Sequence, residues 1–167
     1  MKKQTAIERQ EFERNFYEEM VKTLIGDGSS QILEVKGVDH TAVVLDNLVS
    51  AADKEINVFW RTLDQPALNS DRVYVAFERA INRGIDLKLV VQETGENGLS
   101  RVRRLFRDYQ IPIIPFKPDE LQDQNFVSCD GKAFFLWKYS AEKGAACFND
   151  SSLASQLRLD YGSVRKR

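Results

Sequence analysis

Polar side chains with the chemistry of a ligand site gather in the segment that spans residues 123–132. Asp123 and Asn125 begin this segment, and Asp130 starts the Asp-Gly-Lys turn that ends it. A carboxylate accepts hydrogen bonds, and an amide both accepts and donates them. These residues predict a site for a small, neutral polyhydroxy ligand such as a sugar. The alternative is that they are solvated turn residues with no ligand.

Three further residues are expected at the same site. Trp60 and Arg61 end an apolar run that predicts a strand, and Asn149 follows a later apolar segment. Ligands of open α/β sheets bind beyond the carboxyl ends of the strands. We therefore expect Trp60, Arg61 and Asn149 to line one crevice with Asp123 and Asn125.

A second candidate surface is basic. Apolar residues recur with helical spacing from about Asn97 to Tyr109, which predicts a helix. At about 100° per residue, four arginines fall on the face opposite these apolar residues. They are Arg101, Arg103, Arg104 and Arg107. Such a face can contact nucleic-acid phosphates, or it can be an ordinary solvated helix face.

The elements that must position these residues follow an alternating pattern of strands and helices. Strands are predicted at 32–35, 56–60, 87–91, 111–116, 126–129, 133–139 and 145–148. Between the early strands lie a helix capped by Asp39 or Thr41, a helix capped by Asp71 and the arginine-bearing helix; a short helix follows at 153–159. This order predicts an α/β fold with a mixed, mostly parallel sheet and helices on both faces.

A separate helix is predicted at the start of the chain, from about Ile7 to Leu24. Phe12, Phe16 and Met20 recur every four residues and continue to Leu24. This apolar stripe predicts a face that packs on the domain, and the alternative is a helix that pairs with a second chain. We expect residues 1–28 to form this helix and residues 29–167 to form one domain.

The segment 123–132 resembles the signature motif of the phospholipase D-like superfamily. That motif is His-x-Lys, four further residues, then Asp, commonly followed by Gly-Lys. Asp130, Gly131 and Lys132 match its end, whereas Asp123 stands at the histidine position and Asn125 at the lysine position. The segment 144–150 stands where the family's Gly-Ser-x-Asn element would follow. The resemblance covers roughly Gln31 to Asp160 and implies a phospholipase D-like fold.

The substitutions bear on catalysis. In active members of the superfamily, one histidine attacks phosphorus, a second protonates the leaving oxygen, and lysines hold the phosphate. This chain has one histidine, His40, far from the motif. The resemblance therefore implies a non-catalytic module, with a divergent phosphodiesterase or nuclease as the alternative.

A closer similarity is to the effector domain of TrmB-like archaeal transcriptional regulators, a catalytically silent form of the same fold. Leu33 to Gly37, followed by the Ala51 to Ile56 step, is similar to the opening of that domain. The similarity implies a dimeric, ligand-sensing regulatory domain. It also implies contact with DNA through a missing or partner domain.

Composition limits the remaining classes. The 167 residues are 43% hydrophobic, enough for one domain core, and the formal net charge is −1, so no overall field attracts the chain to nucleic acid. Two cysteines and the lack of a spanning apolar run predict a cytoplasmic protein with no membrane partner. We expect no cofactor and no bound metal, because His40 has no cysteine or histidine at metal-ligand spacing.

Overall fold

A single mixed sheet organises the chain in the computed structural model, which describes residues 5–61, 63, 65–91, 100–115, 124–138 and 143–157. Its strand order is β1-β7-β6-β5-β2-β3-β4. The strands are β1 (Leu33–Val35), β2 (Glu55–Trp60), β3 (Asp86–Val91), β4 (Ile113–Pro115), β5 (Gln124–Cys129), β6 (Ala133–Lys138) and β7 (Lys143–Cys147). The helices are α1 (Ala6–Gly26), α2 (Gly37–Ser50), α3 (Asp71–Asn82) and α4 (Arg101–Asp108), and residues 151–157 are also helical.

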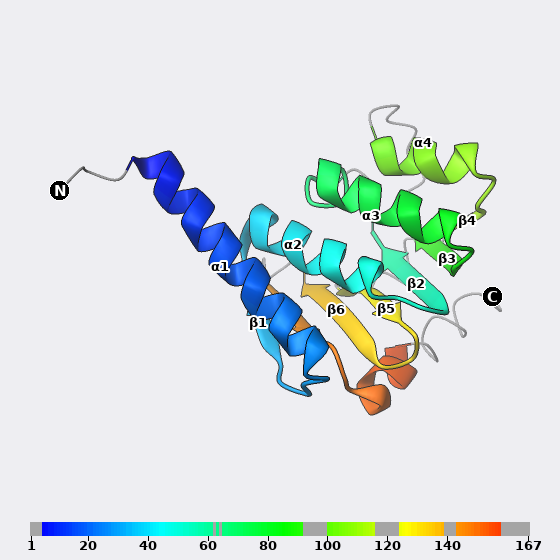
Figure 1. Cartoon of the computed structure of the whole chain (residues 1–167). Helices are drawn as coiled ribbons and strands as arrows, with labels where there is room; N and C mark the ends of the chain where they lie inside the picture. Colours follow the sequence, from blue (N-terminus) through cyan, green and yellow to red (C-terminus); the bar gives the residue numbers. More distant parts are fainter. Residues whose placement is uncertain are drawn as a thin grey trace.

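The parallel part of the sheet is β2, β3 and β4, and the other strands pair antiparallel. Crossovers that contain α3 and α4 connect the parallel strands. The antiparallel part consists of the β5–β6 hairpin, then β7, then β1 (Figure 1). Asp130 and Gly131 turn this hairpin with φ values of 56° and 67°. Two positive φ values in sequence are typical of the tight turn that the Asp-Gly pair predicts.

Helices cover both faces of the sheet, as the sequence predicts. Ile56, Val58 and Trp60 face the larger core beneath α2 and α3. Phe59 faces the opposite side, where residues 151–157 contribute Ala154 and Leu157 to a smaller core. Strand β2 is buried on both faces, which accounts for its almost continuous apolar sequence.

Helix α1 lies along α2 and extends beyond it (Figure 1). Thr5 and Glu8 form a capping box at its start. The helix packs through Tyr17 and Val21, whereas Phe12 and Phe16 are 65% and 69% exposed. The predicted packing stripe is therefore confirmed at Met20 and Leu24, which pack against the core, and wrong at Phe12 and Phe16.

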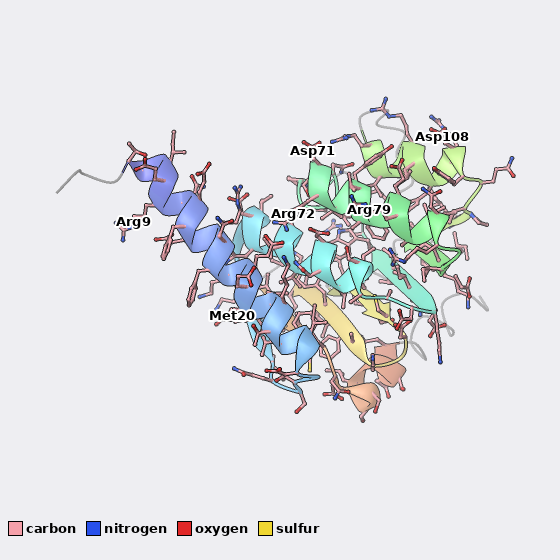
Figure 2. All side chains as sticks on the ribbon, in the orientation of Figure 1. Arg9, Met20, Asp71, Arg72, Arg79 and Asp108 are labelled. Carbon is pink, nitrogen blue, oxygen red and sulfur yellow. The ribbon has the colours of Figure 1, made fainter. Side chains whose placement is uncertain are left out.

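A charged cluster joins α1 to the domain. Arg72 of α3 donates to Glu18 of α1 at 2.5 Å and to Asp46 of α2 at 2.9 Å (Figure 2). All three side chains are only about a quarter exposed, with 27%, 22% and 23% of their surface accessible. Because such pairs are partly shielded from solvent, we infer that this cluster fixes the angle of α1 on the domain.

Several helix starts differ from the predicted caps. Lys36 precedes α2 and forms no side-chain cap, while Thr41 donates back to the carbonyl of Gly37 inside the helix. Ser70, rather than Asp71, is the cap residue of α3. Helix α4 begins after Ser100, whose hydroxyl accepts from Arg103 N, and the predicted start at Asn97 lies outside the described residues. Within the described part of the chain, no helix combines the length and apolarity needed to cross a bilayer.

Candidate functional site

Strand β5 carries the motif residues, and its first described residue is Gln124. Asp123 lies outside the described residues. Asn125 is 1% exposed, and both parts of its amide bond the backbone. Its Oδ1 accepts from Arg61 N at 2.6 Å, and its Nδ2 donates to the Trp137 carbonyl at 3.4 Å. The side chain at the motif's lysine position therefore links the end of β2 to β6.

Asp130 holds the other end of β2. Its carboxylate accepts from the backbone N–H groups of Asp53, Lys54 and Glu55 at 2.9, 2.8 and 3.0 Å. Burial alone would raise the pKa of Asp130, but these three donors, with the charge of Lys132, outweigh burial and lower the pKa below its ordinary value. The carboxylate is thus anionic and engaged with the backbone.

Asn125 and Asp130 lie at opposite ends of β5, about 16 Å apart at the rise of a strand. Asn149 lies near the Asp130 end, where its Nδ2 donates to the Gly28 carbonyl at 2.8 Å. Asp130 and Asn149 both line a small cavity of about 160 Å³. The described residues of the predicted site therefore fall into two groups, with Trp60, Arg61 and Asn125 at one end and Asp130 and Asn149 at the other.

A larger cavity of about 460 Å³ opens at the Trp60 end of the sheet. We call it the exit cavity, because it lies where β2 leaves the sheet. Trp60 and Trp137 line it, together with the start of α2 and the loop after β2. Trp60 is only 2% exposed, and its buried Nε1 has no hydrogen-bond partner among the residues that the structure describes.

Aromatic rings form a row across the sheet beside this cavity. Trp60 stacks on Phe135 at 6.0 Å between centroids, and Phe135 stacks on Trp137 at 6.3 Å. Gly144 of β7 lies beneath the last two rings, since a Cβ there would come within 2.9 Å of Phe135 and 3.0 Å of Trp137. Trp137 lines the cavity but is not among the residues that the sequence predicts for the site. The alternation in β6 could have found it, because this alternation puts Trp137 on the same face as Phe135.

His40, Tyr17 and Cys129 have reactive side chains that are packed within the fold. His40 stacks on Tyr17 at 3.9 Å, between α1 and α2. Burial raises the pKa of Tyr17 to about 12 and raises that of the Cys129 thiol well above its ordinary value, so both groups stay protonated at neutral pH. Among the described residues, no group of histidine, cysteine and carboxylate side chains could hold a metal ion.

The arginines of α4 divide into two kinds. Arg101 pairs with Asp71 and lies 4.7 Å over the ring of Tyr74. Arg103 is half-buried, whereas Arg104 and Arg107 are exposed. The apolar side of the helix, Val102, Leu105 and Phe106, is in the core, as the sequence predicts.

The contacts of Asp130 generate a test based on pH. We expect Asp130→Asn, which tolerates the same left-handed turn, to lower the free energy of unfolding at pH 7 by about 1–2 kcal/mol, because charged hydrogen bonds become neutral ones. The pKa of Asp130 is lower in the folded state than in the unfolded state, where it is about 3.9. The contribution of Asp130 to the free energy of unfolding is therefore fully present above about pH 3.9 and is lost as the pH falls through the folded-state pKa. Urea unfolding at pH 7 and at acid pH measures it.

The comparison variant for this test is Asp53→Asn, since Asp53 contributes only its backbone N–H to the cluster. It should unfold like the parent protein at both pH values. An Asp130→Asn protein as stable as the parent at pH 7 would show that the three bonds contribute little.

Comparison with solved structures identifies the fold. The chain is similar to Nuc from Salmonella typhimurium, a phospholipase D family member, with a TM-score of 0.62, 15% identity, and coverage of 81% of this chain and 93% of Nuc. NucT from Helicobacter pylori matches with a TM-score of 0.59, 11% identity and coverage of 81% and 97%. No family model and no curated protein sequence matches the chain.

A third similar structure is TrmBL2, an archaeal chromatin protein with a novel mode of DNA binding. Its TM-score is 0.59 at 12% identity, with 96% of this chain and 63% of TrmBL2 covered. The part of this chain left unmatched is shorter than the 21 residues of α1, so the similarity extends into that helix. The strand order, the motif hairpin and these similarities together show that the chain has the phospholipase D-like fold.

Proposed function

We propose that this chain is a non-catalytic, ligand-sensing regulatory domain with a phospholipase D-like fold. The observation that carries the proposal is the state of Asn125. A phosphate clamp needs a cationic donor that is free to meet the substrate. Asn125 has no charge and is buried. Its amide oxygen accepts a hydrogen bond from Arg61 N, and its amide nitrogen donates one to the Trp137 carbonyl.

The other end of the motif supports the same proposal. Asp130 accepts three backbone N–H groups at the start of β2, away from the exit cavity. The chain's one histidine, His40, is stacked on Tyr17 between two helices. Neither residue is placed to attack phosphorus or to protonate a leaving oxygen. The exit cavity remains as a site where a ligand could bind without reaction.

A hydrolysis assay tests the proposal. We expect no release of p-nitrophenol from bis(p-nitrophenyl) phosphate above the buffer rate, with or without added Mg²⁺, because the nucleophile and the phosphate clamp are both absent from the motif. Release by the parent protein that Asp130→Asn or Asn125→Ala abolishes would contradict the proposal. Release that both variants retain would point to a contaminating enzyme and leave the proposal in place.

We also propose that the protein forms a homodimer through α1. Phe12 and Phe16 are one turn apart on the side of α1 away from Tyr17 and Val21. A two-fold pairing of antiparallel helices centred between these phenylalanines would bury four rings. Each Phe can bury on the order of 150–250 Å². The total is below a standard interface of about 1,600 Å², so the expected dimer is weak and concentration-dependent.

Sedimentation velocity over a range of concentrations tests the dimer. We expect the double variant Phe12→Ser/Phe16→Ser to remain monomeric at concentrations where the parent protein dimerises. The control is Ile7→Ser, since Ile7 is equally exposed at 70% but lies about 140° around the helix from Phe12. Equal dimerisation of all three proteins would rule out this surface.

A second candidate function is contact with DNA through α4, which the exposure of Arg104 and Arg107 favours. TrmBL2, one of the structures to which this chain is similar, binds DNA. If this surface binds a DNA duplex, the double variant Arg104→Ala/Arg107→Ala loses two phosphate contacts. The slope of the logarithm of the binding constant against the logarithm of the salt concentration should then become shallower by about 2, because each contact contributes about 0.9. Fluorescence anisotropy at salt concentrations from about 50 to about 200 mM measures the slope, because DNA affinity changes strongly over this range.

The control for the DNA measurement is Arg101→Ala, because the Arg101 guanidinium is already paired with Asp71 and packed on Tyr74. It should change the slope less than the double variant does. A slope that no arginine substitution alters would exclude α4 as the DNA-binding surface.

A further inference from the structure

The outer side of α1 carries a regular stripe of exposed residues. Its members alternate in spacing between four and three residues, so they share one line along the helix, as the contact seam of two paired helices does. All of them are exposed, on the side away from the buried Tyr17 and Val21. We call this line the outer stripe; it consists of Thr5, Arg9, Phe12, Phe16, Glu19 and Thr23.

The outer stripe is complementary to itself when it is reversed. Phe12 and Phe16 lie at equal distances on either side of Arg14, and so do Arg9 and Glu19. An antiparallel second copy centred on Arg14 would therefore place Phe12 against Phe16 of that copy. The same register would place Arg9 against Glu19 of the second copy, once at each end of the phenylalanine cluster.

The two charged side chains of the stripe are accessible for this pairing. Arg9 donates from Nε to Glu13 of its own helix at 3.3 Å, and its side chain is 76% exposed. That contact leaves the two terminal nitrogens of the guanidinium to meet a second carboxylate. Glu19 is 77% exposed and lies 4.0 Å from Lys22. Exposed pairs within one helix contribute little, so they compete weakly with a contact between copies.

The position of α1 on the domain leaves room for a second copy. Every residue from Thr5 to Phe16 is exposed, and this half of the helix, with Arg9, extends beyond the domain (Figures 1 and 2). The contacts with the domain begin at Tyr17 and use a different side of the helix. In an antiparallel pair, the uncovered half of each helix meets the anchored half of the other, and the two domains lie at opposite ends.

The uncovered half of α1 also needs a partner on physical grounds. Short helical segments without tertiary packing are marginal in water, because packing supplies most of the stability of a helix. The capping box at Thr5 and Glu8 supports only the first turn. A second copy packed along the outer stripe would supply the missing contacts.

We propose that the partner of α1 is a second copy of this chain held in one antiparallel register, with two Arg9–Glu19 ion pairs flanking the phenylalanine rings. The ion pairs select this register more than they add affinity. A parallel alignment would instead place Arg9 against Arg9 and Glu19 against Glu19. The inference rests on the proposed α1 homodimer and defines which residues of the second copy it meets.

Charge reversal followed by sedimentation velocity tests the register. Arg9→Glu and Glu19→Arg each turn two attractive contacts into repulsive ones, so each variant should dimerise at least about tenfold more weakly than the parent protein. Arg9→Glu/Glu19→Arg restores both pairs with exchanged charges and should dimerise within about twofold of the parent. An equimolar mixture of the two single variants should form heterodimers, because every contact between them is attractive.

The control for these variants is Glu11→Arg. It changes the net charge as Glu19→Arg does, from an exposed position about 100° around the helix from Phe12. It should dimerise like the parent protein. Circular dichroism of each variant confirms that α1 is still helical. Salt at about 1 M should bring the single reversals closer to the parent, because it shortens the screening length to about 3 Å.

The register and the dimer itself fail in different ways. Single reversals that dimerise like the parent, with Phe12→Ser/Phe16→Ser monomeric, would overturn the register and leave the α1 dimer standing. A double reversal as weak as the single ones would also overturn the Arg9–Glu19 pairing. A parent protein that is monomeric at every concentration would overturn the register and the dimer together, and the hydrolysis assay would still decide the non-catalytic role.

Discussion

Asn125 of β5 and Asp130, in the turn that follows β5, hold the two ends of β2, and the arrangement of the candidate site depends on them. The Asp130 carboxylate accepts three N–H groups where β2 begins, and the Asn125 amide accepts the N–H of Arg61 where β2 ends. Backbone groups at strand ends need such partners when the ladder does not supply them. Strand β2 pairs with β5 on one side and with β3 on the other, so fixing it joins the antiparallel half of the sheet to the parallel half.

This arrangement also determines where the rings lie. Trp60 is the last residue of β2, next to the Arg61 N–H that Asn125 holds. Asn125 in turn reaches the Trp137 carbonyl, so one buried amide sets the spacing between the strands that carry both tryptophans. Phe135 fills the space between the indoles, and Gly144 leaves room beneath them. The exit cavity therefore lies beside rings that pack around the buried, neutral Asn125.

The sequence predicts the elements well because they depend on local patterns. The apolar run of β6, the Asp-Gly turn and the apolar face of α4 are all visible in short windows. The roles of Asn125 and Asp130 are different, since their backbone partners are 64 and 75–77 residues away in the chain. The residues next to a polar side chain at a strand end do not show whether that side chain hydrogen-bonds a ligand or the backbone. The choice between the stripes of α1 likewise depends on the shape of the domain against which the helix packs.

The exit cavity differs from a phosphate site in how it can stabilise an anion. Lysine at the motif position would offer a full positive charge, whereas Asn125 is neutral and no cationic side chain from the described residues lines the exit cavity. Without a nearby cation, a phosphodiester that leaves water loses its hydration with no opposite charge to offset that cost. An uncharged apolar ligand has less hydration to lose, and burial of its surface contributes about 25 cal/mol per Å². A neutral, buried amide at this position thus favours discrimination by shape and apolar surface over discrimination by charge.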